Sequence, residues 1–177
     1  MTDDKNAPKQ GQINIELDEK VAEGTYSNLD IINQVDKGTL MVDYFGHGGE
    51  DGWSGEGVFR LPEIQSLKNQ HKLPLFITVT CEFSRFDNPL RKTAGEFLFW
   101  KEDYGASTLI STTREIYISV GQALNEQLVR PLLSFNGEDL SIAEALTNII
   151  WAPFLLFISK WMICFPITIV KITKTQF

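Results

Sequence analysis

The sequence has 177 residues, enough for one domain with a sizeable hydrophobic core. Hydrophobic residues make up 43% and charged residues 22%, which is typical of a globular protein and not of a disordered one. The formal net charge of −7 argues against nucleic-acid binding, because phosphate contacts require clustered lysine and arginine. The local basic group of Arg85, Arg91 and Lys92 is interrupted by Asp87, and we interpret it as a solvated loop.

Residues 1–28 are polar and rich in turn-forming residues, and we interpret them as a loosely ordered leader with one short strand at 12–17. No signal peptide is recognisable, because the first residues lead into a polar segment without an apolar stretch. This start predicts either a cytosolic protein or an internal piece of a longer chain. At 28–37, apolar residues spaced three apart predict a helix, which Gly38 ends.

Two apolar strands are predicted, and each one ends at a chemically reactive residue. The strand at 40–45 leads to His47, within a run (46–57) whose six glycines predict a loop. The strand at 75–80 leads to Cys81, and its apolar, β-branched composition is typical of a strand covered on both faces. The separation of the two strands leaves room for one crossover helix.

The other predicted elements continue an alternation of strands and helices. Helices are predicted at 60–70, 93–103, 119–133 and 141–149, a third strand at 106–112, and a loop at 82–92. Expected local features are Pro62 in a first turn, Ile64 and Leu67 facing inward, Phe97, Leu98 and Trp100 buried, and a capping box from Ser141 to Glu144. This order predicts an α/β fold with a parallel sheet and right-handed connections.

The chain changes character at its C-terminal end. Residues 149–170 contain one charge, Lys160, and their length and hydropathy meet the criterion for a membrane span. Pro153, Pro166 and the central Lys160 weaken that interpretation. The alternative is that the apolar tail, 149–177, has no native structure at the edge of an incomplete domain.

A cysteine and a histidine at equivalent strand ends suit nucleophilic catalysis. The nucleophile is a thiolate, so an imidazole nearby must accept the thiol proton, and His47 is the candidate base for Cys81. His71 lies in a polar run and is predicted to be on the surface. The backbone N–H groups of Gly48 and Cys81 are the candidate donors to an oxyanion. Taken alone, the glycines at 46–49 favour a simple tight turn, and only the equivalent positions of His47 and Cys81 weaken that alternative.

Other site chemistries fit the sequence less well. A phosphate-binding loop is excluded, because no Gly-Lys-Ser/Thr follows the glycines and Glu50, Asp51 and Glu56 would repel phosphate. A structural zinc site needs four ligands with paired spacing, and that pattern is lacking. Cys81 and Cys164 alone do not make a disulfide framework.

Two motifs resemble the histidine and cysteine blocks of gingipain-type cysteine peptidases. They are YFGHGGEDGW at 44–53 and TCEFSRFDNP at 80–89, and the segment at 96–113 is also similar to the family. The resemblance extends over 29–147, and within the family it is greatest to the sortase branch of the type IX secretion system. It implies a caspase-like α/β/α sandwich with a mostly parallel sheet, of which residues 29–148 form an incomplete catalytic domain.

The resemblance also implies a function. Cys81 matches the family's nucleophile and His47 its catalytic histidine. Such an enzyme cleaves polypeptides through an acyl-enzyme, removes C-terminal sorting domains from secreted proteins at the bacterial outer membrane, and joins the new C-terminus to lipopolysaccharide by transpeptidation. The implied partners are secreted proteins and the secretion machinery of the cell envelope. No cofactor is expected, and the calcium that the family suggests has no assignable ligands here.

Three residues are candidates for the substrate cleft, each with a simpler alternative. Thr113 and Arg114 end the third strand, but Arg114 also suits a surface ion pair with Glu115. Trp53 would close one wall of the cleft, or else it packs over the loop. At the level of function, the alternatives are a catalytically incompetent, membrane-associated fragment or pseudoenzyme, and a soluble, cytosolic relative of the caspases.

Overall fold

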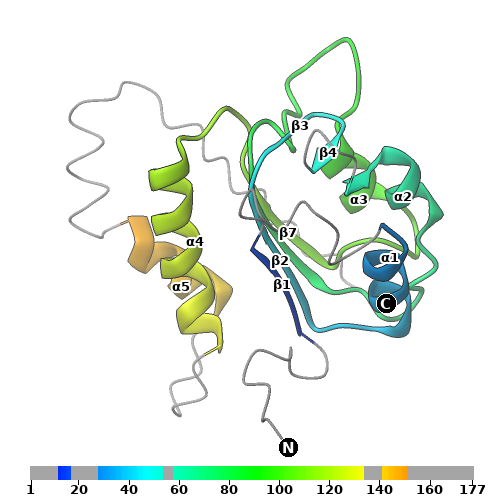
Figure 1. Ribbon diagram of the computed structural model, residues 1–177, viewed down its shortest axis with the longest axis horizontal. Helices are drawn as coiled ribbons and strands as arrows, with labels where there is room; N and C mark the ends of the chain where they lie inside the picture. Colours follow the sequence, from blue (N-terminus) through cyan, green and yellow to red (C-terminus); the bar gives the residue numbers. More distant parts are fainter. Residues whose placement is uncertain (1–11, 17–27, 54–57, 134–140, 151–177) are drawn as a thin grey trace, which may run out of the picture.

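The computed structural model describes residues 12–16, 28–53, 58–133 and 141–150 (Figure 1). The strands in these ranges are β1 (Gln12–Glu16), β2 (Met41–Phe45), β3 (Gly48–Gly49), β4 (Gly52–Trp53), β5 (Phe59–Arg60), β6 (Leu75–Val79) and β7 (Thr108–Ser111). The helices are α1 (Asn28–Lys37), α2 (Leu61–Ser66), α3 (Ala94–Trp100), α4 (Ile118–Leu133) and α5 (Ile142–Ile150).

A four-stranded parallel sheet forms the middle layer, with strand order β1-β2-β6-β7. Helices α1, α2 and α3 lie on one side of this sheet, and α4 and α5 lie on the other (Figure 1). This arrangement confirms the predicted α/β/α sandwich with a parallel sheet. It also confirms the strand expected at 12–17, which forms β1 beside β2. The predicted domain boundaries, after residues 28 and 148, remain predictions.

Alternate residues of the strands supply two separate hydrophobic cores. On the side of α1, α2 and α3, the fully buried side chains of Val42, Tyr44 and Phe76 join those of the helices. On the side of α4 and α5, Met41, Ile77 and Val79 pack with the leucines of α4. A strand that is covered on both faces needs apolar residues throughout, which explains the continuous apolar runs in the sequence.

The glycine-rich run and the residues that follow it form a second, smaller sheet that the sequence did not predict. Strands β3, β4 and β5 pair in antiparallel fashion, with Gly48 opposite Trp53 and Trp53 opposite Phe59. The predicted loop at 46–57 is therefore wrong in part, although residues 54–57 lie outside the described ranges. The small sheet follows β2 directly, so it fixes the path of the chain immediately after His47.

Two helices end earlier than predicted, and α2 shows the physical reason. Helix α2 stops at Ser66 and not at 70, because the Lys101 ammonium donates to the carbonyls of Ile64, Gln65 and Leu67 (3.4, 2.7 and 3.0 Å). These carbonyls lie at the C-terminal end of the helix, where the Ile64 carbonyl also accepts the N–H of Leu67 (3.4 Å), and a cation there complements the helix dipole. By contrast, α1 has the predicted bounds, and Gly38 follows it at φ +104° as a helix-ending glycine does.

Helix α3 begins as predicted but buries a different aromatic residue. Thr93 caps its N-terminus and exchanges hydrogen bonds with Glu96. The helix ends at Trp100, and the Trp100 side chain is 59% exposed, so its predicted burial is wrong. Phe99 is buried instead, because it lies on the same helix face as Gly95, four residues earlier.

The C-terminal helices match their predicted positions. Helix α5 carries the expected capping box, in which the backbone N–H and hydroxyl of Ser141 donate to the Glu144 carboxylate and Ser141 Oγ accepts from the Glu144 N–H. None of the helices in the described ranges is long and apolar enough to cross a membrane. The predicted apolar tail lies almost entirely outside these ranges.

Candidate functional site

His47 and Cys81 follow neighbouring strands at the same edge of the sheet. Strand β2 pairs with β6 in parallel, and the last pair in the register is Phe45 with Val79. His47 and Cys81 each lie two residues beyond this pair, and the N–H of Gly46 extends the pairing by donating to the Val79 carbonyl (3.3 Å). The His47 side chain is exposed and Cys81 is half-buried. His47 and Cys81 therefore follow the carboxyl ends of adjacent strands, as the sequence predicted.

The backbone of His47 is held by Tyr44, a residue of the aromatic core. The Tyr44 hydroxyl donates to the His47 carbonyl (2.5 Å). The Tyr44 ring is in turn stacked on Trp53, with ring centroids 4.3 Å apart and planes 5° apart. The conformation of the histidine loop thus depends on a fully buried aromatic pair.

Gly48 brings the histidine loop, residues 46–50, against Thr80, the residue that precedes Cys81. A Cβ on Gly48 would lie 2.3 Å from Thr80 Oγ1 and 2.9 Å from the Gly52 carbonyl oxygen. Only glycine fits at this separation without displacement of a neighbour. The two strand ends are therefore packed closely at this position.

The chain around Cys81 is fixed by backbone contacts with the segment after β7. The N–H of Glu82 donates to the Arg114 carbonyl (3.2 Å), and the Thr112 hydroxyl donates to the Thr80 carbonyl. Cys81 is a free thiol, and its Sγ lies 3.9 Å from the Ile116 carbonyl oxygen. Glu82 has φ +53°, so the chain turns sharply, in the left-handed region, directly after the cysteine.

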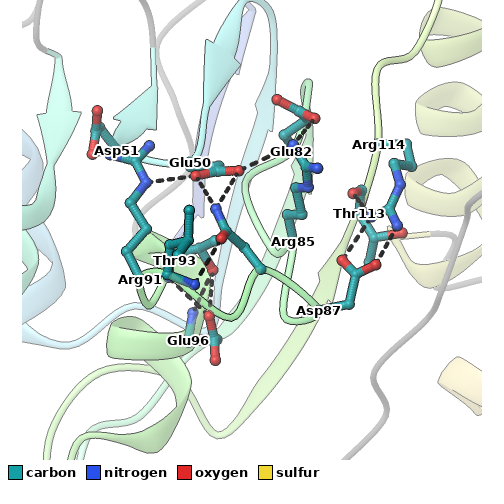
Figure 2. Close-up of polar contacts among 12 residues, drawn as sticks. Glu50, Asp51, Glu82, Arg85, Asp87, Arg91, Thr93, Glu96, Thr113 and Arg114 are labelled. Carbon is teal, nitrogen blue, oxygen red and sulfur yellow. Dashed lines mark hydrogen bonds and ion pairs between the residues drawn. The ribbon is translucent and has the colours of Figure 1, made fainter.

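Glu50, which was not predicted as a site residue, links the loop after His47 to the loop after Cys81 (Figure 2). The Glu50 carboxylate accepts hydrogen bonds from Arg85 Nη1 (3.3 Å), Asn88 Nδ2 (3.0 and 3.1 Å) and Arg91 Nε (2.5 Å). Arg91 also pairs with Asp51 (3.0 Å). Arg85 and Arg91 are partly exposed, as expected for a solvated loop, but they also form ion pairs that the sequence did not predict. The only signal in the sequence was opposite charge in the two loops.

The ion pairs around Glu50 shift the titration of the groups involved. Hydrogen bonding from Arg91 lowers the pKa of Glu50, with Asn88 and the charge of Arg85 acting in the same direction against the effect of burial. The same contact raises the pKa of Arg91. The Glu50 side chain is only 9% exposed, so these interactions are poorly screened by water.

Acid is expected to weaken this link once the pH is low enough to protonate Glu50 itself. The pKa of Glu50 is lower in the folded protein than in the unfolded chain, where it is about 4.3. Its contribution to stability is then complete above that value and is lost as the pH falls through the folded-state pKa. The difference in urea midpoint between wild type and Glu50→Gln should be constant from pH 7 to about 5 and shrink below about pH 4. A difference that grows in acid would contradict the assignment.

The three candidate cleft residues are placed differently from one another. Thr113 is buried. Arg114 forms an ion pair with Asp87, not with Glu115, so the predicted partner is wrong (Figure 2). Trp53 is completely buried, and this supports the packing alternative over a place in the cleft wall. Of the three, Arg114 alone is partly exposed.

In the part of the chain that the structure describes, no group of three histidine, cysteine or acidic side chains could hold a metal ion. The site consists of a thiol, an imidazole, backbone amides and the surrounding ion pairs. Such a set can support acyl transfer by a nucleophile and a base.

Comparison with solved structures identifies the fold. The chain is similar to RgpB in the complex of Porphyromonas gingivalis RgpB pro- and mature domains (TM-score 0.55, 22% identity, 62% of this chain and 26% of that chain). It is also similar to the crystal structure of the Arg-specific cysteine proteinase gingipain R (TM-score 0.50, 25% identity, 62% of this chain and 27% of that chain). The chain thus spans about a quarter of the length of these proteins. The search of curated proteins gives no match.

The family is shown by a sequence match over most of the chain. Residues 2–155 match the model of peptidase family C25, and the matched range includes both strand ends described above. The gingipain-like fold agrees with this match. The chain therefore belongs to peptidase family C25.

Proposed function

We propose that this chain carries the reactive groups of a cysteine peptidase, with Cys81 as the nucleophile and His47 as the base. The observation that carries the proposal is the register of β2 and β6, which leaves both residues two positions beyond the same strand pair. The close approach at Gly48 supports it, because the two loops are in contact where the dyad would act. Membership of family C25 supports the same chemistry.

In the proposed mechanism, His47 accepts the proton of the Cys81 thiol and the thiolate attacks the scissile carbonyl carbon. The N–H groups of Gly48 and Cys81 donate to the resulting oxyanion. When the tetrahedral intermediate collapses, the C–N bond breaks and the His47 imidazolium protonates the leaving amine. Water, or an amine, then attacks the thioester and releases the thiol. No cofactor takes part in these steps.

Two features of the thiol environment bear on this mechanism. The sharp turn at Glu82 resembles the strained turns that present nucleophiles in other hydrolases, and strain of this kind is concentrated at functional sites. The Cys81 thiol makes a weak contact, in which Sγ lies 3.9 Å from the Ile116 carbonyl oxygen, with the segment after β7. We infer that the thiol turns from Ile116 toward His47 when it is activated.

We infer further that the substrates are polypeptides and that the protein acts as a sortase. The motifs at 44–53 and 80–89 resemble those of PorU, the sortase of the type IX secretion system. This resemblance supports removal of C-terminal sorting domains and transpeptidation to lipopolysaccharide at the cell envelope, with the secretion machinery as partner. In that proposal, 29–148 is part of the catalytic domain, and the tail at 149–170 is a candidate membrane contact.

Covalent labelling of the chain with a peptidyl electrophile tests the dyad. In a Cys164→Ala background, we expect stoichiometric labelling at Cys81 and no labelling of Cys81→Ala. The labelling rate of His47→Ala should be at least about 100-fold lower, because general-base assistance is lost. His71→Ala is the matched control and should react like the parent. Slow labelling that is indifferent to His47 would contradict the proposal and favour a catalytically incompetent fragment or pseudoenzyme.

A further inference from the structure

We propose that Glu50 is a positioning residue for the Cys81–His47 dyad, because it ties the loop that carries His47 to the loop that follows Cys81. This inference rests on the proposed function. Glu50 lies three residues after His47, and its three side-chain partners, Arg85, Asn88 and Arg91, all come from the loop after Cys81. In Figure 2 the Glu50 carboxylate lies at the centre of this set of contacts.

The backbone of Glu50 is anchored to the same region. Its carbonyl accepts the N–H of Ala94, the first residue of α3, at 2.7 Å. At the other end of this segment, the His47 carbonyl accepts a hydrogen bond from the Tyr44 hydroxyl. The backbone of the segment from 47 to 50 is therefore fixed at both ends, with one contact to its own strand and one to the first residue of α3.

The link requires a carboxylate. Two guanidinium groups and an amide converge on Glu50, and a carboxylate can accept all of them through its two oxygens. Hydrogen bonds between charged partners are about twice as strong as neutral ones. Glutamine at this position has one acceptor oxygen, and its NH₂ group would face cationic donors. Glu50→Gln should therefore loosen the link between the loops while it changes the shape of the residue little.

The fold should tolerate this change. Without Glu50, Arg91 keeps its ion pair with Asp51, and Arg85 keeps its ion pair with Glu82 (3.0 Å). The two arginine side chains, of Arg85 and Arg91, are 39% and 48% exposed, so water also solvates them. No buried charge is left without compensation, which is the usual cause of severe destabilisation.

The test measures the rate of Cys81 alkylation by iodoacetamide against pH, in the Cys164→Ala background. We expect Glu50→Gln to lower the rate near neutral pH about 10- to 100-fold, as small misplacements of reacting groups do. Its pH profile should coincide with that of His47→Ala, because the base is then no longer held in place beside the thiol. The double variant His47→Ala/Glu50→Gln should react no more slowly than His47→Ala alone, because Glu50 acts through the position of His47.

Asp51→Asn is the matched control, because it removes a neighbouring charge that also pairs with Arg91 but is 75% exposed. It should leave the profile unchanged. A wild-type profile in Glu50→Gln, or an equal further loss in the His47→Ala background, would overturn the inference and leave the proposed function standing. Equal rates in wild type and His47→Ala would instead overturn the proposed function.

Circular dichroism will show whether Glu50→Gln folds. If it does not, Asn88→Ala decides the question, because this neutral change removes one donor to Glu50 and leaves both ion pairs in place. It should lower the alkylation rate in the same direction by a smaller factor and shift the profile in the same sense. An unchanged rate and profile in Asn88→Ala would then overturn the inference.

Discussion

Replacing Gly48 with alanine is expected to destabilise the protein and to slow reactions of Cys81, because the new methyl group has no room. Its Cβ would lie 2.3 Å from the hydroxyl oxygen of Thr80, a fully buried residue, and 2.9 Å from a backbone carbonyl. Overpacking of this kind costs about 1–3 kcal/mol. The histidine loop must also move away from the strand end that carries Cys81. We expect an alkylation rate about 100-fold lower, measured alongside urea unfolding.

Gly49→Ala is the matched control for this experiment, because a Cβ at Gly49 has no atom within 4 Å. It should change the free energy of unfolding by no more than about 0.5 kcal/mol. Removing the Thr80 hydroxyl, which the new methyl group would strike, should restore part of the alkylation rate. The double variant Gly48→Ala/Thr80→Ala should therefore react faster than Gly48→Ala. Indistinguishable Gly48→Ala and Gly49→Ala proteins would contradict the close packing of the two strand ends.

The part of the site that could be predicted from the sequence is the part encoded locally. Apolar runs identify β2 and β6, and parallel pairing then places the residues after them at one edge of the sheet. This is why the sequence alone was enough to select His47 and Cys81 together. Gly38 and the Ser141–Glu144 capping box are local signals of the same kind, and both occur as predicted.

The features that were missed depend on contacts between distant residues. Glu50 is separated from Arg85 by 35 residues and from Arg91 by 41, so no periodicity or motif relates them. Lys101 shortens α2 from 36 residues away. The two-residue strands β3, β4 and β5 are too short to show an alternating pattern. Such features form only when the sheet has brought the loops together.

The interpretation of Trp53 depends on the same distinction between local sequence and tertiary packing. In the sequence it is a tryptophan in a glycine-rich run near the proposed dyad, which suits a cleft wall. In the structure β4 pairs with both β3 and β5, and Trp53 lies in the core that contains Tyr44 and Phe76. Its link to the histidine loop is the stacking on Tyr44, whose hydroxyl donates to the His47 carbonyl.

Trp53→Ala is accordingly expected to cost more stability than Gly48→Ala or Glu50→Gln, about 3–5 kcal/mol. Trp53 is completely buried, and its ring packs within 4.3 to 6.3 Å of four other aromatic rings, those of Tyr44, Phe59, Phe76 and Phe83. Small domains have only about 5–15 kcal/mol in total, so urea unfolding should begin at a much lower concentration.

Trp100→Ala provides the control for Trp53→Ala, because it is the same truncation at a side chain that is 59% exposed and contacts one ring, that of Phe99. It should cost about 1 kcal/mol or less. The loss of stability in Trp53→Phe should lie between those of Trp53→Ala and Trp100→Ala, since an aromatic ring remains in the core. This change also removes an indole N–H that has no hydrogen-bond partner within the described residues. Equal unfolding free energies for Trp53→Ala and Trp100→Ala would show that the aromatic core does not support the histidine loop, and the stabilising role of Trp53 would have to be abandoned.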